Sequence, residues 1–138
     1  MRTPELETAF RATTYRVETE GQAFDLKVDL PDPAFASWLK SQSAPCWGIV
    51  TACNPRGALA ADNEARTKRL QEEIEERGWS HVPAVNRADA ANWPDEPGFC
   101  VLGVQTTELR MLAAAFDQSA IVVGGSDGAG AILWIEGS

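Results

Sequence analysis

The sequence of 138 residues is poor in metal-binding and disulfide-forming side chains. It contains a single His and only three Cys, and no two Cys form a Cys-x-x-Cys pair. Because zinc sites are usually built from clustered Cys and His, we expect no metal, and nothing in the chain predicts a cofactor. Cys46, Cys53 and Cys100 are odd in number and lie in apolar stretches, which is typical of reduced thiols in a cytoplasmic protein.

Basic side chains and long apolar runs are also scarce. Twelve Lys and Arg stand against 20 Asp and Glu, so the formal net charge is −8. This balance argues against binding to nucleic acid or to an anionic membrane. Apolar runs such as residues 120–123 and 131–135 are too short to span a bilayer. The first ten residues lack an apolar core of signal-peptide length, so we expect a cytoplasmic protein.

The remaining composition is that of an ordinary folded domain. Hydrophobic residues make up 44% and charged residues 23% of the chain. No internal repeat, low-complexity tract or long linker interrupts it. A chain of this length can bury a self-sufficient core, so we expect residues 1–138 to form a single domain.

Hydrophobic periodicity and capping residues predict the secondary structure. Thr3 and Asp32, each followed by Pro, are typical of helix starts, and Gly78 is typical of a helix end. Alternating apolar residues predict a hairpin of two strands around a turn at residues 20–22. Apolar runs predict buried strands at 46–52, 99–104 and 119–124. Further helices are expected from 62 or 63 to 77 and from Thr106 or Thr107, a strand at 79–85, a loop at 86–98, and a last strand at 131–135.

This order of elements is α-β-β-α-β-α-β-β-α-β-β. Two stretches, 46–85 and 99–124, have the strand–helix–strand form that places a helix on a sheet. Hairpins at both ends of the chain favour antiparallel strands as well. We therefore predict an α+β, or α/β, fold with a single mixed sheet and helices packed on it. Pro83 places its strand at an edge or makes it irregular.

The most informative segment joins the strand at 46–52 to the helix that starts near residue 62. Asn63, Arg66, Leu70 and Ile74 share one helical stripe, and the last two identify that stripe as the buried one. An inward Arg66 near a helix N-terminus requires a carboxylate such as Glu96, a set of carbonyls, or an anionic ligand. Residues 56–69 carry four basic and two acidic side chains, a local charge of +2.

Other polar residues have both a structural and a functional interpretation. Asn54, before Pro55, is typical of a turn or forms a backbone clamp at the strand end. Glu96 is a weak candidate for a general acid or base, and Trp93 is interpreted as a lid over the core. His81 and a nucleophilic Cys53 are minor candidates, because the thiol needs a base or a positive neighbourhood. The glycines at 124–130 lack a following helix and indicate a turn rather than a phosphate loop.

Several segments together resemble an uncharacterised bacterial family, domain of unknown function 3293. The resemblance rests on five stretches in order: residues 49–55, 63–70, 93–96, 101–103 and 116–121. It covers roughly residues 10–125 and implies no established activity, so no catalytic residue is carried over. The matching positions are Asn54, Pro55, Asn63, Trp93, Pro94, Glu96, Gly103 and Gln118. Two positions depart from the pattern: Cys53 stands where an aromatic residue is expected, and Asp117 where Gly is expected.

Three hypotheses for function follow. The first is a domain that binds a small polar or anionic ligand, or a protein partner, through Asn54, Asn63, Arg66, Glu96 and Gln118. The second is an enzyme, a hydrolase or transferase acting on a nucleotide-like or acidic metabolite, with Glu96 as acid or base. The third is an acidic interaction protein in which these polar residues are purely structural. A pocket lined by the polar residues favours the first two hypotheses over the third.

Overall fold

The computed structural model describes residues 3–135, and its first two helices begin where the sequence predicts. Helix α1 (Pro4–Arg11) is capped by Thr3, whose Oγ1 accepts a hydrogen bond of 3.1 Å from the Leu6 amide. Helix α2 (Pro33–Ser41) is capped in the same way, with 2.8 Å between Asp32 Oδ1 and the Phe35 amide. Each cap satisfies an amide that has no partner within the helix.

The order of elements is as predicted. The other helices and strands are β1 (Thr13–Thr19), β2 (Gln22–Leu26), β3 (Cys46–Thr51), the 3₁₀ turn η1 (Pro55–Gly57), α3 (Asn63–Glu76), β4 (Ser80–Ala88), β5 (Glu96–Leu102), α4 (Thr106–Ala115), β6 (Ala120–Gly125) and β7 (Gly130–Trp134). Two local predictions were wrong. The expected loop at 86–98 is shorter, because β4 continues to Ala88 and β5 already begins at Glu96. Helix α4 follows Gln105, which provides no side-chain cap, and both threonines lie inside its first turn.

The strands form one sheet in the order β2-β1-β4-β5-β3-β6-β7, and each pair of neighbours is antiparallel. The α+β class is confirmed, whereas the mixed sheet was wrong. The predicted strand–helix–strand units do connect parallel strands, but another strand lies between the two in each case. Strand β5 separates β3 from β4, and β3 separates β5 from β6. Local periodicity does not show such an insertion, because the inserted strand comes from elsewhere in the chain.

Pro83 lies within β4, which has a neighbour on each side. The pairing with β1 begins only at Ala84, which lies opposite Val17, whereas the pairing with β5 includes Pro83 itself. At Pro83 the strand is therefore locally an edge, where a missing backbone donor leaves no acceptor of a second strand unpaired.

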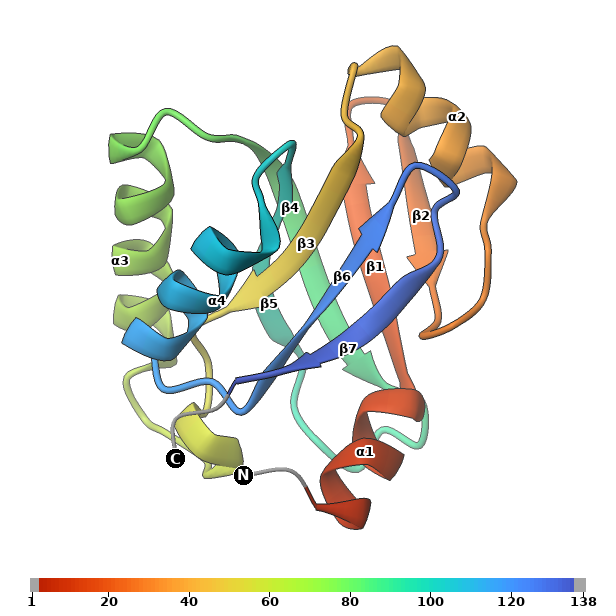
Figure 1. Ribbon diagram of the computed structural model, residues 1–138. Helices are drawn as coiled ribbons and strands as arrows, with labels where there is room; N and C mark the ends of the chain where they lie inside the picture. The colour runs from red at the N-terminus through yellow and green to blue at the C-terminus, as the bar shows by residue number, and fades with distance from the viewer. Residues whose placement is uncertain (1–2, 136–138) are drawn as a thin grey trace.

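The sheet has an apolar core on each face. On one face, α3 and α4 pack through Leu70, Ile74, Leu109 and Leu112 (Figure 1). On the other, concave face, α2 covers the strands beside the start of β3. There the Phe35 ring meets the Trp47 ring edge-on, with 5.0 Å between the centroids.

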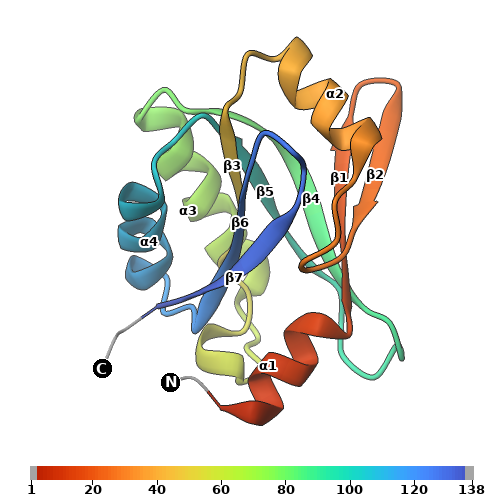
Figure 2. The ribbon, with the colours of Figure 1, turned by 45° about the vertical axis from the view of Figure 1, so that its right-hand side comes forward.

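The concave face curls until the two edge strands meet at one point. Val28, just after β2, forms a parallel bridge with Gly130 at the start of β7, and the Asp29 amide donates to the Gly130 carbonyl at 2.7 Å. From there β7 diverges, and α1 lies beneath the opening, with Phe10 5.9 Å from Trp134 between ring centroids (Figure 2). The result is a half-barrel that α2 fills beside the start of β3 and that opens toward α1 beside its end.

Candidate functional site

Asn54 is the centre of a hydrogen-bonded network at the end of β3. It is only 3% exposed and adopts a left-handed conformation, with φ 48° and ψ 63°. Its Oδ1 accepts hydrogen bonds from Asn63 Nδ2 at 2.8 Å and from the Ala60 amide at 3.0 Å. Its amide N–H donates to Asn63 Oδ1, and its Nδ2 donates to Glu96 Oε2, both at 2.8 Å. Asn54 therefore clamps the start of α3 to the start of β5.

Arg66 points inward, as the helical stripe predicts, but it does not pair with Glu96. Its Nε donates to the Ala52 carbonyl and its Nη2 to the Phe116 carbonyl, both at 2.7 Å. A set of carbonyls is thus its partner. Gln118 acts similarly, because its Nε2 lies 3.1 Å from the Cys53 carbonyl and 3.2 Å from that of Phe116. Both side chains join the end of β3 to the end of α4.

Glu96 is held at one oxygen and free at the other. Its Oε2 accepts hydrogen bonds of 2.8 Å from Asn54 Nδ2 and from Trp93 Nε1. No hydrogen bond to Oε1 is formed by any residue from 3 to 135. Trp93 is 37% exposed, so it flanks this carboxylate rather than covering the core. The arrangement leaves one oriented acceptor available to a ligand.

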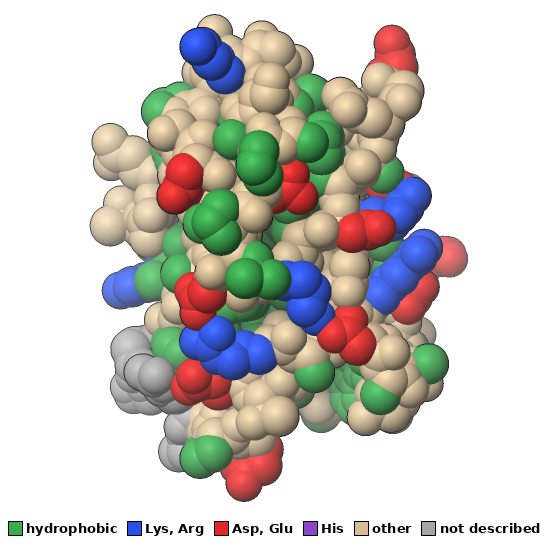
Figure 3. All heavy atoms as spheres, turned by 90° about the vertical axis from the view of Figure 1, so that its right-hand side faces the viewer, with side chains coloured by type: hydrophobic (Ala, Val, Ile, Leu, Met, Phe, Trp, Pro, Cys, Tyr) green, Lys and Arg blue, Asp and Glu red, His purple; other side chains and the backbone are tan. Residues whose placement is uncertain are grey.

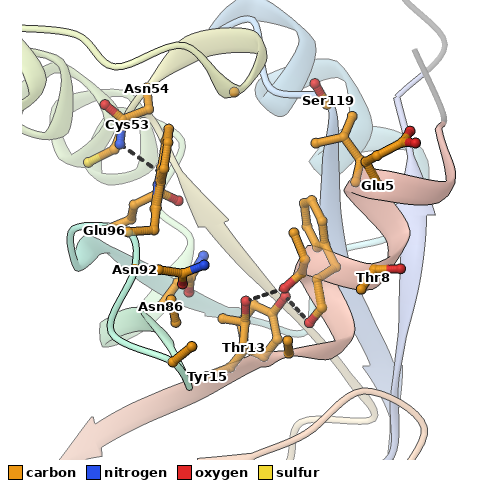
Figure 4. A pocket seen from close by; sticks show the side chains of 18 of the residues that line it. Glu5, Thr8, Thr13, Tyr15, Cys53, Asn54, Asn86, Asn92, Glu96 and Ser119 are labelled. Atoms are coloured by element: carbon orange, nitrogen blue, oxygen red, sulfur yellow. Dashed lines mark hydrogen bonds between the residues drawn. The ribbon is translucent and has the colours of Figure 1, made fainter.

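A pocket of about 440 Å³ opens beside Glu96, at the open end of the half-barrel (Figure 4). Its walls come from α1, the start of β1, the end of β4, the 90–93 loop and the ends of the central strands. The lining residues are Glu5, Leu6, Thr8, Ala9, Phe10, Ala12, Thr13, Tyr15, Cys53, Asn54, Gly57, Asn86, Ala88, Ala90, Asn92, Trp93, Glu96, Gln118 and Ser119. Of the predicted binding residues, Asn54, Glu96 and Gln118 line the pocket, whereas Asn63 and Arg66 support it from behind.

The floor of the pocket contains a row of side chains that the sequence analysis missed. The register places Tyr15 opposite Asn86, and Asn86 opposite Glu96, so three adjacent strands present these residues side by side. The side-chain amide of Asn86 makes no hydrogen bond with residues 3–135. Within that range, no polar side-chain atom is both buried and unpaired. The Asn86 amide is therefore accessible from the pocket. Only the pairing register of the three strands reveals this row of side chains.

Tyr15 closes the inner end of this row. Its hydroxyl donates to the Phe10 carbonyl at 3.0 Å and so anchors the last turn of α1. Burial raises the pKa of the Tyr15 phenol above its ordinary value, and the charge of Glu96 adds to this effect. Tyr15 is therefore a neutral structural donor at physiological pH.

The charge around the pocket is negative. Glu5 and Glu96 contribute carboxylates, and the lining contains no Lys, Arg or His. None of the basic side chains in the locally positive stretch at 56–69 lines the pocket. Arg56 pairs with Asp117 at 3.3 Å, and Arg66 binds carbonyls. Asp117 has φ 57°, a conformation that favours glycine, at the position where the family resemblance expects Gly.

The minor candidates lie in unreactive surroundings. Cys53 is buried, and its Sγ lies 3.6 Å from both Thr67 Oγ1 and the Pro97 carbonyl, without a basic neighbour in the pocket. His81 lies near the start of β4, at the opposite end of the sheet, with Nδ1 2.9 Å from the Trp79 carbonyl. The 124–130 segment forms the predicted turn, in which Asp127 Oδ1 accepts from the Ala129 amide at 3.0 Å.

The surface over β1 and β2 bears on the interaction-protein hypothesis. Acidic and basic side chains alternate on this face (Figure 3). Ion pairs between Arg16 and Asp25 at 3.1 Å and between Arg11 and Asp29 at 2.7 Å belong to it, as does a pair between Lys27 and Asp89. This face therefore carries a mixed charge pattern and is not uniformly acidic.

Clusters of metal-binding side chains and membrane-spanning helices are both absent from residues 3–135. No group of three His, Cys, Asp or Glu side chains in this range is arranged to hold a metal ion. No helix in the same range has both the length and the apolar character to cross a membrane.

These features define a single-sheet α+β protein with a polar, acidic pocket at the open end of its half-barrel. The chain belongs to the family described as protein of unknown function DUF3293, which matches residues 50–121 and confirms the resemblance seen in the sequence. The matched span contains the Asn54 network and the Asn86–Glu96 pair, whereas α1 and Tyr15 lie outside it. No curated protein and no solved structure matches the chain.

Proposed function

We propose that this protein binds a small polar molecule in the pocket at the open end of the half-barrel. The observation that carries the proposal is the pair formed by Glu96 and Asn86, neighbours across β4 and β5. Glu96 Oε1 and the Asn86 amide have no hydrogen-bonding partner within residues 3–135, whereas the surrounding Asn54 and Gln118 are engaged in the network behind them. Polar groups without partners that converge on a concave site are typical of ligand recognition.

The size and position of the pocket support the same function. A volume of about 440 Å³ lies within the range of small-molecule sites. The mouth of a barrel-like sheet is a common place for such sites, because strand ends bring side chains from distant parts of the chain together. Here the network of Asn54, Asn63 and Arg66 holds those strand ends in place. Of the predicted polar residues, Glu96 therefore faces the ligand, whereas Asn54, Asn63 and Arg66 support the site.

A thermal-shift screen of the full chain tests the proposal. The probes are nucleosides, free amino acids, sugars, amines and carboxylic acids. A probe at about ten times its Kd adds about 1.4 kcal/mol of stability, which raises the Tm of a 138-residue domain by about 5 °C. Assaying each positive probe for chemical change distinguishes binding from the enzyme hypothesis, in which Glu96 acts as acid or base.

The matched variant is Asn86→Leu. Because the Asn86 amide makes no hydrogen bond within residues 3–135, its removal leaves the free energy of unfolding nearly unchanged while ligand stabilisation is lost. Gln71→Leu, the same kind of change at an exposed position of α3, serves as the control and retains ligand stabilisation. Stabilisation that persists in Asn86→Leu, or a screen in which no probe stabilises the protein, refutes binding at this site.

A further inference from the structure

We infer that the ligand carries a planar nitrogen cation of the amidinium or guanidinium type, an inference that rests on the small-molecule binding proposed above. Three features of the pocket support it: its negative charge, a pair of adjacent acceptors, and an aromatic wall beside them. Glu96 contributes to the first two features, and Trp93 provides the third.

The charge selects against anions. The lining contains Glu5 and Glu96 but no basic side chain, and the whole chain carries a formal charge of −8. A carboxylate or phosphate ligand would meet like charge in the pocket, whereas a cation gains a charge-assisted hydrogen bond with Glu96. The pocket therefore favours a cation, and not the anion that the sequence left open.

The acceptors favour a planar cation with two donors. Asn86 and Glu96 lie directly opposite each other on paired strands, where side chains are about 5 Å apart at Cβ. Glu96 Oε1 and Asn86 Oδ1 together match the two neighbouring N–H groups at the edge of an amidinium or guanidinium. The hydrogen bonds from Asn54 and Trp93 to Oε2 orient the carboxylate before the ligand arrives, which reduces the entropy cost of binding.

The aromatic wall favours a flat, weakly hydrated cation over an ammonium ion. Trp93 lines the pocket, and the bond from its Nε1 to Glu96 fixes the indole beside the acceptor pair. A guanidinium or amidinium stacks on an aromatic face and gives up its water more readily than an ammonium. Phe10 and Leu6 of α1 provide apolar surface for the body of the ligand.

Three probes of the same shape test the charge. Benzamidine, benzamide and benzoate are cationic, neutral and anionic, and each is titrated into the full chain by calorimetry. Benzamidine is expected to bind at least about tenfold more tightly than benzamide, and benzoate is expected not to bind, because a charged hydrogen bond is worth about 1.4 kcal/mol or more over a neutral one. N-acetylarginine amide, with the cation on a flexible peptide fragment, is expected to bind more weakly than benzamidine.

Two variants assign the effect to Glu96. Glu96→Gln keeps an oxygen for Asn54 and Trp93 but removes the charge, so the preference for benzamidine over benzamide is expected to disappear. Glu72→Gln, the same charge change on the exposed face of α3, is expected to retain it. Urea unfolding of both variants measures whether each remains folded.

The outcomes separate this inference from the proposed function. Equal or tighter binding of benzamide or benzoate overturns the cation while it leaves the pocket as a binding site. Failure of benzamidine to bind also overturns it, and the wider screen then decides the proposed function alone. If N-acetylarginine amide binds more tightly than benzamidine, the inference of a small-molecule ligand is overturned, because the pocket then prefers a cation presented by a peptide.

Discussion

Replacing Asn54 with alanine is expected to lower the free energy of unfolding by about 3 kcal/mol. The change removes three side-chain hydrogen bonds, to Asn63 Nδ2, the Ala60 amide and Glu96 Oε2. At about 0.5–1 kcal/mol each for partners that water can reach, they contribute about 2 kcal/mol. Alanine must also adopt the left-handed conformation of residue 54, φ 48°, which costs roughly 1 kcal/mol more than it costs asparagine.

A second substitution separates these two contributions. Asn54→Gly removes the same hydrogen bonds, but glycine adopts a positive φ without strain, so this variant is expected to lose only about 2 kcal/mol. Asn92→Ala is the control, because Asn92 is exposed in the neighbouring loop and has no side-chain hydrogen bond within residues 3–135. Its free energy of unfolding is expected to change by less than about 0.5 kcal/mol.

Equilibrium unfolding in urea measures all three variants, with the midpoint shifting while the slope stays constant. The alanine variant is expected to melt about 10 °C below the natural protein, from the specific entropy of a 138-residue domain. A glycine variant as stable as the natural protein would refute the role of Asn54 as a clamp. Equal losses for alanine and glycine would refute the contribution of the left-handed backbone.

Two further predictions concern the sheet and the pocket floor. Gly124→Ala is expected to lower the free energy of unfolding in urea by at least about 2 kcal/mol, because its Cβ would lie 2.4 Å from the Ala129 carbonyl oxygen. Gly125→Ala is the control: nothing lies within 4 Å of its Cβ, so its free energy of unfolding is expected to stay nearly unchanged. Equal losses for the two variants would contradict this packing. Burial raises the pKa values of Tyr15 and Cys100, which in the unfolded chain are about 9–10. The stability that their neutral forms contribute is therefore complete below about pH 9 and is lost as the pH rises above those unfolded-state values. Tyr15→Phe is expected to lose about 1 kcal/mol at pH 7 and to show a shallower decline in urea titrations between pH 9 and 11, and an unchanged decline would refute the assignment to Tyr15.

Part of the candidate site follows from local sequence. The stripe that Leu70 and Ile74 define shows that Asn63 and Arg66 face inward, and both do. Helical geometry specifies a direction but not a partner, so the same pattern allowed a carboxylate, carbonyls or an anion for Arg66. The partner is a pair of carbonyls, from Ala52 and Phe116. The end of α4 lies beside the end of β3 because β6, the strand that follows α4, is the neighbour of β3 in the sheet.

The floor of the pocket lies beyond sequence reasoning for a related reason. The sequence predicts a loop at Asn86, since nothing in the neighbouring residues shows that β4 continues past it. Its role depends on pairing with Tyr15 on one side and Glu96 on the other. Tyr15 is 71 residues away in the chain, and register is a property of two strands together.

The sequence by itself determined the local elements and the class of the fold. Three features show this: the helix caps at Thr3 and Asp32, the alternation along the first hairpin, and the apolar runs of the central strands. Each depends on interactions within a few residues, which can be recognised in one segment of chain. The tertiary structure alone decided that the strands between the two terminal hairpins are antiparallel as well, that the sheet curls toward α1, and that a negatively charged pocket opens there. These features depend on contacts between distant segments, whose pairing is selected by the packing of both faces at once.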